Sequence, residues 1–484
     1  MEMHLLFEMF QLLVAMVMVI AVVLGGGELG RLCCVVGFLW EWWFEVEELE
    51  GDFGVGGWRR PFLFSKIKSE WLRGMEQNVS LKYNGTGESL RGGTSFFKTC
   101  LNGLNALSGV GILSMPYAVS QGGWTSLILL LIVATVCWYT GLLLQRCMDA
   151  HPLIKSYPDI GNVAFGYKGR VVVAIFMYLE LYLIAVEFLI LEGDNLEKLF
   201  PNMNFKIAGL RIRGKAGFVL LTALVILPTT WLKSLGVLAY ISVGGVVASL
   251  ILIVCVVCVG EVDEIGFHQK GELVNWKGLP STVSLFAFCY CGHAVFPTLR
   301  NSMKDRTQFY KVLMVCFITS TITYGSMAII GYKMFGEHVN SQVTLNLPTK
   351  KISTKIAIYT TLINPFTKYA VIITPIANAI EETLPLLYKG RPIVILIRTT
   401  IVLSTLLVAL FIPFFAYVMA FIGAFLSVAG SWIFPCLCHL KMNKAAQKFG
   451  MELVIIIGIL FTGSIIAVVD TYISIIQIIR DIKL

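Results

Sequence analysis

The sequence predicts an all-α polytopic membrane protein, and three observations support this fold class. Of the 484 residues, 57% are hydrophobic and only 14% are charged, and the mean hydropathy is +0.78. A soluble domain carries about 25% charged residues, so this chain lacks the polar surface that water requires. Several apolar windows reach the length of about 20 residues that crosses a bilayer. Because backbone groups in hydrocarbon must be satisfied within their own segment, these windows are predicted to be helices.

The predicted spans follow one another with short loops between them, and the fourth is the shortest. The net charge of +8 is spread over these loops as Lys and Arg flanking the spans, which argues against a nucleic-acid partner. Eleven spans are predicted, at 96–120, 123–146, 171–193, 216–231, 234–260, 281–302, 309–335, 353–380, 392–412, 414–438 and 452–475.

The N-terminal part differs from the bundle. Residues 1–93 are predicted to be a cytoplasmic region, and residues 94–484 the transmembrane transporter domain. An extra apolar segment at about 10–24 has no preceding Lys or Arg, so it lacks the basic part of a signal peptide. The sequence leaves open whether it spans the bilayer, lies at its surface or reflects a misassigned gene start. Gly25 to Gly30 fits the pattern GxGxxG but lacks the strand and helix that a dinucleotide site needs.

Two predicted spans are interrupted near their middle. In the first span Gly111 precedes Pro116 by five residues, and in the sixth span Gly292 precedes Pro297 by five. Glycine weakens a membrane helix and proline removes a helix hydrogen bond. The two interruptions lie five spans apart, as in inverted repeats of five helices that bind substrate between their broken helices. Close helix packing without a substrate is the alternative explanation.

Unwound main chain suits a zwitterion. The first N–H groups of a resumed helix favour a carboxylate, and carbonyls left at the end of the preceding half-helix accept bonds from an ammonium. An amino acid has one group of each kind. The residues predicted to bind it are Ser108, Gly109, Val110, Gly111 and Ile112 in the first span, Phe288, Cys289, Tyr290 and Gly292 in the sixth, and Asn364 in the eighth.

Ionisable residues within the spans are candidates for ion coupling, because such groups are costly at membrane depth. His293 adjoins the second interruption, and Glu180 and Glu187 are seven residues apart, hence on one helix face. Each could instead be structural, with Lys368 as a partner for either glutamate. Thr367 would allow a cation site between the first and eighth spans, so sodium is not excluded as the coupled ion.

Four stretches resemble the amino acid/auxin permease family, most closely its plant vacuolar amino acid transporter branch. They are 94–118 (with Leu107-Ser-Gly-Val-Gly-Ile-Leu-Ser-Met-Pro116), 157–170, 288–297 (Phe-Cys-Tyr-Cys-Gly-His-Ala-Val-Phe-Pro) and 364–370. The resemblance covers about 94–480, whereas residues 1–60 depart from it. It implies the LeuT-type fold of five plus five helices with an eleventh, a cytoplasmic N-terminus and proton-driven movement of amino acids, often out of a vacuole.

The sequence therefore predicts a secondary active transporter of amino acids that works by alternating access, as a monomer in the vacuolar membrane, with the proton as the expected coupling ion. No cofactor, metal site or catalytic residue is predicted, since HExxH, GxSxG and Walker patterns are lacking and most of the twelve cysteines lie in or beside apolar spans. Two alternatives stay open. One is a transport-dead amino acid sensor that signals through the N-terminal tail. The other is a permease for auxin or another small carboxylate at the plasma membrane.

Overall fold

The computed structural model describes residues 93–482, apart from 152, 202, 204, 208–209, 213, 232–237, 263–264 and 384–389. The predictions made for residues 1–92, which include the apolar segment at 10–24 and the glycine pattern at 25–30, lie outside the described residues.

The described chain is almost entirely helical. Its one short hairpin pairs β1 (Phe205–Ile207) antiparallel with β2 (Leu210–Ile212). The helices are α4 (Phe96–Leu107), η1 (Val110–Ser114), α5 (Met115–Gly122), α6 (Ser126–Ala150), α7 (Tyr157–Leu199), α8 (Gly214–Thr230), α9 (Leu238–Val262), α10 (Leu279–Cys289), α11 (Phe296–Ser302), η3 (Arg306–Gln308), α12 (Phe309–Phe335), η4 (Gly336–His338), η5 (Val343–Leu345), α13 (Ile352–Thr383), α14 (Arg391–Phe411), α15 (Phe415–Phe421), η7 (Ile422–Ser427), η8 (Ala429–Ile433), α16 (Phe434–Met442) and α17 (Met451–Ile482).

The helices confirm a multi-span, helical architecture. Eight spans in the described part of the chain are long and apolar enough to cross a membrane, and two shorter apolar helices are α8 and α10. The count of eleven spans and the division into five plus five stay predictions. Exposed Leu, Ile, Val and Phe side chains are common on the long helices, as expected where the solvent is lipid.

Helix α7 is longer than the predicted third span at 171–193. It begins at a capping box in which Ser156 and Asp159 each accept a backbone N–H of the other, which fixes the start of the helix. Gly166 then adopts φ 69°, a conformation that side chains disfavour, and divides the helix at a kink. The kink separates a first segment near one end of the bundle from the span itself, and the apolar window alone does not reveal that first segment.

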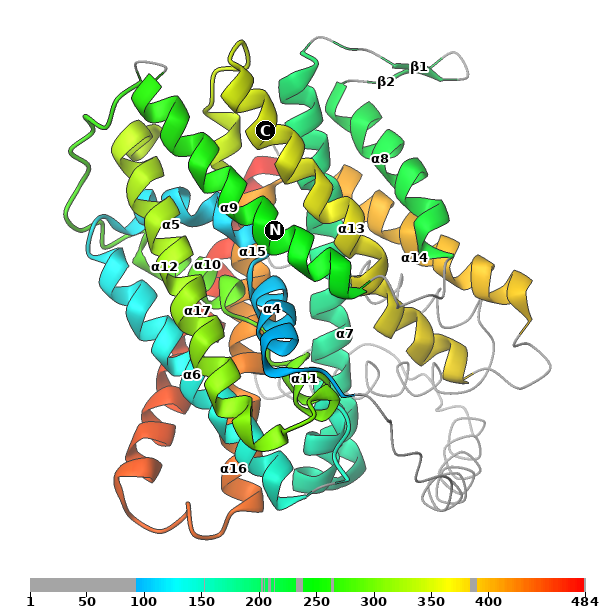
Figure 1. Ribbon diagram of the computed structural model, residues 1–484, viewed down its shortest axis with the longest axis vertical. Coiled ribbons are helices and arrows are strands. Elements are labelled where there is room, and N and C mark those ends of the chain that lie inside the picture. The colour runs from blue at the N-terminus through cyan, green and yellow to red at the C-terminus, as the bar shows by residue number, and fades with distance from the viewer. Residues whose placement is uncertain are drawn as a thin grey trace, which may run out of the picture. The chain divides into compact units, whose positions relative to one another are not determined.

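The short helices lie among the long ones. Helices α4 and α5 both pack against α12, and α11 contacts α4 and α6 (Figure 1). The predicted tenth span is a single run in which two π-helical segments, η7 and η8, separate α15 from α16. Wider turns of this kind occur often at functional sites. They bring Gly423 of η7 against the backbone of Ser284 in α10, so the tenth span packs closely on the first half of the sixth.

Candidate functional site: two unwound segments that meet

The first span is broken, as the sequence predicts. Helix α4 ends at Leu107, and Gly109 is extended with φ −95° and ψ −162°. The chain resumes as the 3-10 turn η1 and continues as α5, which has Pro116 in its first turn. Proline suits that position because the first N–H groups of a helix have no partner within it.

The sixth span is broken over a longer stretch. Helix α10 ends at Cys289, and α11 begins at Phe296 with Pro297 in its first turn. The six residues between form turns of their own, in which the N–H of Cys291 donates to the carbonyl of Phe288 (3.2 Å). Both interruptions predicted from glycine and proline are therefore confirmed, and each helix ends three or four residues before its glycine.

The two breaks touch each other through their glycines. A Cβ at Gly111 would overlap Sγ of Cys289 and lie 3.3 Å from its Cβ. A Cβ at Gly292 would lie 2.9 Å from Cδ2 of Leu107. Each glycine thus packs on the last helical residue of the other broken helix, a reciprocal contact of the kind that a two-fold relation produces. The close approach explains why both positions need a residue without a side chain.

Side chains from two other helices donate hydrogen bonds to the carbonyls at the end of α4. Nζ of Lys368, in α13, donates to the carbonyl oxygens of Asn105 (3.1 Å) and Ser108 (2.8 Å). The hydroxyl of Tyr324, in α12, donates to the carbonyl of Leu107. The last carbonyls of a helix have no partner within it, so these donors complete the end of α4. Lys368, which the sequence offers as a possible partner for a glutamate of the third span, binds main-chain oxygens instead.

The two predicted glutamates approach the second break from α7. Glu187 is fully buried, lies within electrostatic range of Cys289, and neither of its carboxylate oxygens has a hydrogen-bond partner among the described residues. Glu180 accepts a hydrogen bond from Oγ of Ser427 (2.6 Å) and also interacts with the thiol of Cys291. Glu180 therefore reaches the second break, and Glu187 lies within electrostatic range of the residue at which α10 ends.

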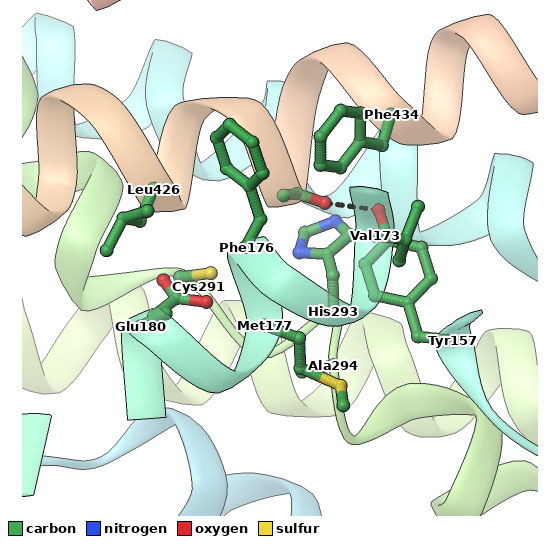
Figure 2. Close-up of a pocket in the computed structure, with 11 residues that line it drawn as sticks. Tyr157, Val173, Phe176, Met177, Glu180, Cys291, His293, Ala294, Leu426 and Phe434 are labelled. Atoms are coloured by element: carbon green, nitrogen blue, oxygen red, sulfur yellow. Dashed lines mark hydrogen bonds between the residues drawn. The ribbon is translucent and has the colours of Figure 1, made fainter. Parts of the chain in front are cut away.

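A small pocket, lined mostly by apolar side chains but with a few polar groups, lies beside the second break. Figure 2 shows Glu180 and Cys291 at one side, Tyr157 at the other and the imidazole of His293 between them. Nε2 of His293 lies 3.0 Å from Oγ1 of Thr140, and its Nδ1 has no partner among the described residues. The Tyr157 hydroxyl donates to a carbonyl of η8. The pocket has room for about one water molecule.

A second pocket lies beside the first break and also has room for about one water molecule. It is formed by the unwound segment and η1, by α9 and by α13. Oγ of Ser108 lies 2.7 Å from Oγ of Ser249 at its wall. Three of the five residues predicted on the first span line this pocket, namely Gly109, Val110 and Ile112. The predicted Asn364 of α13 lines it too, together with Ser249 of α9 and Thr361 of α13 among others.

Two predicted residues are not placed at the meeting point of the breaks. Cβ of Phe288 lies 3.2 Å from a Cβ built at Gly423, so Phe288 is directed toward the π-helical segment η7 and not toward the first break. The side chain of Thr367 lies outside the described part of the chain. The cation site predicted between the first and eighth spans therefore stays a prediction.

One end of the bundle is closed by a loop. Gln342 is fully buried, accepts a bond from Nδ2 of Asn195 (2.6 Å) and donates to the carboxylate of Asp194 (3.0 Å). Lys215 of α8 forms an ion pair with the same carboxylate. Oγ of Ser114, in η1, donates to the carbonyl of Ser341 (2.8 Å). These contacts tie the loop after α12 to both the first and the third spans.

The sequence reasoning missed two buried polar groups near the breaks. Tyr324 carries no signal, because a tyrosine in an apolar span is ordinary. Asp470 of α17 is 2% exposed and accepts a hydrogen bond from Oγ of Ser284 in α10. An acidic residue inside an apolar span is a signal that could have found Asp470. Among the described residues no cluster of three or more His, Cys, Asp or Glu could hold a metal ion.

Known proteins resemble this chain over most of its length. Residues 92–476 match the family described as transmembrane amino acid transporter protein. The chain is 49% identical to the amino acid transporter AVT1I of Arabidopsis thaliana over 408 residues, which cover 84% of this chain and 100% of that one. Amino acid transporter AVT1J of the same plant is 47% identical over 424 residues, covering 87% and 97%.

More distant proteins are also similar. The vesicular GABA transporter of Caenorhabditis elegans is 26% identical over 415 residues, which cover 80% of this chain and 81% of that one. Among solved structures, a sodium-coupled sialic acid symporter in a substrate-bound outward-open state matches with a TM-score of 0.49 and 9% identity, covering 78% of this chain and 89% of that one.

Proposed function

The chain belongs to the transmembrane amino acid transporter family, and on that premise we propose that it is a secondary active transporter that moves amino acids with protons by alternating access. One observation supports this above the others. Two helices are unwound where they meet, and Gly111 and Gly292 each pack on the end of the other broken helix. This arrangement supports the inverted repeat of five plus five helices, whose substrate site lies between the two broken helices.

The substrate carboxylate would bind at the first break. The opening N–H groups of η1 have no helical partner, and the helix dipole favours an anion there. The ammonium needs another partner, because Lys368 and Tyr324 already occupy carbonyls of α4. We assign this role to Glu187, which is buried, unbonded within the described residues and within electrostatic range of Cys289.

The coupled ion is proposed to be a proton and not sodium. The ammonium of Lys368 sits where carbonyls at the end of α4 would hold a metal cation, and among the described residues it contacts no carboxylate. The Lys368 ammonium supplies the positive charge that a bound metal cation would otherwise provide. It can gain and lose a proton, so a proton takes the place of the metal ion in coupling. Glu180 and His293, at the adjoining pocket, are further groups through which a proton could pass.

Transport requires the site to open. Both pockets beside the breaks have room for about one water molecule, and Gln342 closes one end of the bundle. We propose that α4, α5, α6, α10, α11 and α12 rock against the remaining helices, as a bundle moves in inverted-repeat transporters. The relatives named as amino acid transporters, together with the resemblance to the vacuolar branch, favour the vacuolar membrane.

The test is uptake by the purified full chain in liposomes. Labelled amino acids and indole acetic acid are supplied with and without a pH gradient, each with and without sodium. We expect accumulation of amino acids that depends on the pH gradient and is indifferent to sodium. Binding without flux would indicate a sensor, accumulation of indole acetic acid alone would indicate an auxin permease, and a sodium requirement would contradict the assignment to the proton.

A further inference from the structure

One hydroxyl group reaches both broken helices. Tyr324 of α12 is fully buried, and its hydroxyl donates to the carbonyl of Leu107 and lies 3.2 Å from the carbonyl of Cys289. These two residues are the last of α4 and of α10. The hydroxyl therefore lies at the place where the two unwound segments begin.

The carbonyls that Tyr324 meets belong to the two helix ends, and that of Leu107 also accepts from the N–H of Gly109 (2.8 Å). The last carbonyls of a helix lack partners within it, and a buried acceptor without a partner is destabilising. A phenol has a single donor hydrogen, so the two carbonyls share it. Leu107 and Cys289 are also the residues on which Gly292 and Gly111 pack. The hydroxyl and the two glycine contacts thus form one junction between the breaks.

Helix α12 holds the tyrosine ring firmly at this junction. The Tyr290 ring lies edge-to-face with that of Tyr324, with centroids 5.4 Å apart, and is stacked on Phe317 at 5.9 Å. The hydroxyl of Tyr290 donates to Oγ1 of Thr321 (2.8 Å), one turn before Tyr324. Because the neighbouring rings fix its orientation, the Tyr324 hydroxyl is directed at the carbonyls and not at solvent.

We propose that Tyr324 is a positioning residue that joins the two unwound segments through the hydroxyl shared by Leu107 and Cys289, so that both segments move as one unit when the site opens. The expected effect on transport rests on the proposed function, whereas the junction itself rests on the hydrogen bonds alone. A substrate held between the breaks would depend on this junction because the junction sets the distance between its two half-sites.

The first measurement is the kinetics of Tyr324→Phe in liposomes, which removes only the donor. We expect KM for the transported amino acid to rise about tenfold, with the maximal rate per inserted protein changed less than KM. The matched control is Tyr332→Phe on the same helix, which removes the hydroxyl of another fully buried tyrosine, one that contacts Glu337 and the N–H of Glu272. The control should keep the KM of the unchanged chain.

The second measurement does not require transport. N-ethylmaleimide labelling followed by peptide mass spectrometry reports the exposure of Cys289, which is 4% exposed and packs against Gly111. Without the shared hydroxyl the breaks separate more readily, so Cys289 should be labelled several times faster in Tyr324→Phe. Labelling of Cys436, fully buried in α16, should not change. If Tyr324→Phe speeds the labelling of Cys289 but the unchanged chain transports no amino acid, the proposed transport function is rejected and the junction is kept.

A third substitution, with a ring of matched size, separates the loss of the hydrogen bond from a change in packing. Placing 4-fluorophenylalanine at position 324 fills the space of the hydroxyl but cannot donate, so it should reproduce the rise in KM and in Cys289 labelling. If both substitutions leave KM and Cys289 labelling unchanged, Tyr324 does not join the breaks and the proposal is overturned.

Discussion

The two broken helices have the same design in sequence and different lengths in structure. Each contains a glycine followed five residues later by a proline. In the first, only Ser108 and Gly109 separate α4 from η1. In the second, the six residues 290–295 separate α10 from α11. The shared spacing fixes where the breaks meet but not how much main chain each one unwinds.

The two breaks also satisfy their polar groups differently. The first break receives donors from outside, since Lys368 and Tyr324 bind the carbonyls of α4. The second break forms main-chain turns of its own and sends side chains outward, with His293 bonded to Thr140 and Tyr290 to Thr321. A positive charge is therefore built into the first break, whereas the second break meets the acidic side chain of Glu180 through Cys291 and otherwise bonds to hydroxyl groups.

This difference shows how a repeated architecture acquires two kinds of half-site. Repetition supplies two gaps in the helices, and the surrounding helices determine what chemistry each gap offers. We expect the first break to be sensitive to changes of volume and of charge, and the second to respond more weakly, through single hydrogen bonds. The following substitutions test that ranking.

The largest effect is expected for Gly111→Leu. Its side chain must occupy the space of the Cys289 sulfur, and overpacking of this kind costs about 1–3 kcal/mol or more. The contact between the breaks would be lost and uptake should fall to background. Insertion should persist because leucine raises the hydrophobicity of the span. The control is Gly458→Leu, whose added Cβ meets no atom within 4 Å. Full uptake by Gly111→Leu in liposomes would show that the substrate does not bind at this place.

The next largest effect is expected for Lys368→Met, which keeps the apolar stem and removes the ammonium. Two buried carbonyls at the end of α4 lose their donor, at about 1–3 kcal/mol for an unsatisfied buried group. We expect uptake driven by a pH gradient to fall about 10- to 100-fold at equal membrane abundance. Lys355→Met, exposed on the same helix, is the control. An unchanged response to the pH gradient would show that Lys368 does not couple the proton.

These same residues show how much of the candidate site the sequence predicts. Gly111, Pro116, Gly292 and Pro297 identify both breaks, because loss of helix hydrogen bonds is a local property of glycine and proline. The main-chain partners of Lys368 could not be predicted, for a physical reason. Sequence reasoning pairs a buried ammonium with a carboxylate, and the carbonyls it actually binds become available only after α4 has ended.

Other features depend on contacts between distant segments. Tyr324 is one of seventeen tyrosines, and nothing in its neighbourhood distinguishes it until α12 is packed against both breaks. The close approach of Gly423, in the π-helical segment η7, to the backbone of Ser284 likewise joins segments far apart in the sequence. Periodicity therefore predicts the helices, whereas the polar junctions between them require the assembled bundle.

The smallest effect is expected at the second break, from Thr140→Val in α6. The change is nearly isosteric and removes the partner of Nε2 of His293, a single hydrogen bond worth about 0.5–1.5 kcal/mol. Uptake should fall about two- to tenfold, as measured by KM and maximal rate in the same liposomes. Thr135→Val, exposed on the same helix and bonded only to its own turn, should have no effect. A loss as large as that of Lys368→Met would mean that the hydrogen bond of His293 matters as much as the ammonium of Lys368, and the ranking of the two half-sites would not hold.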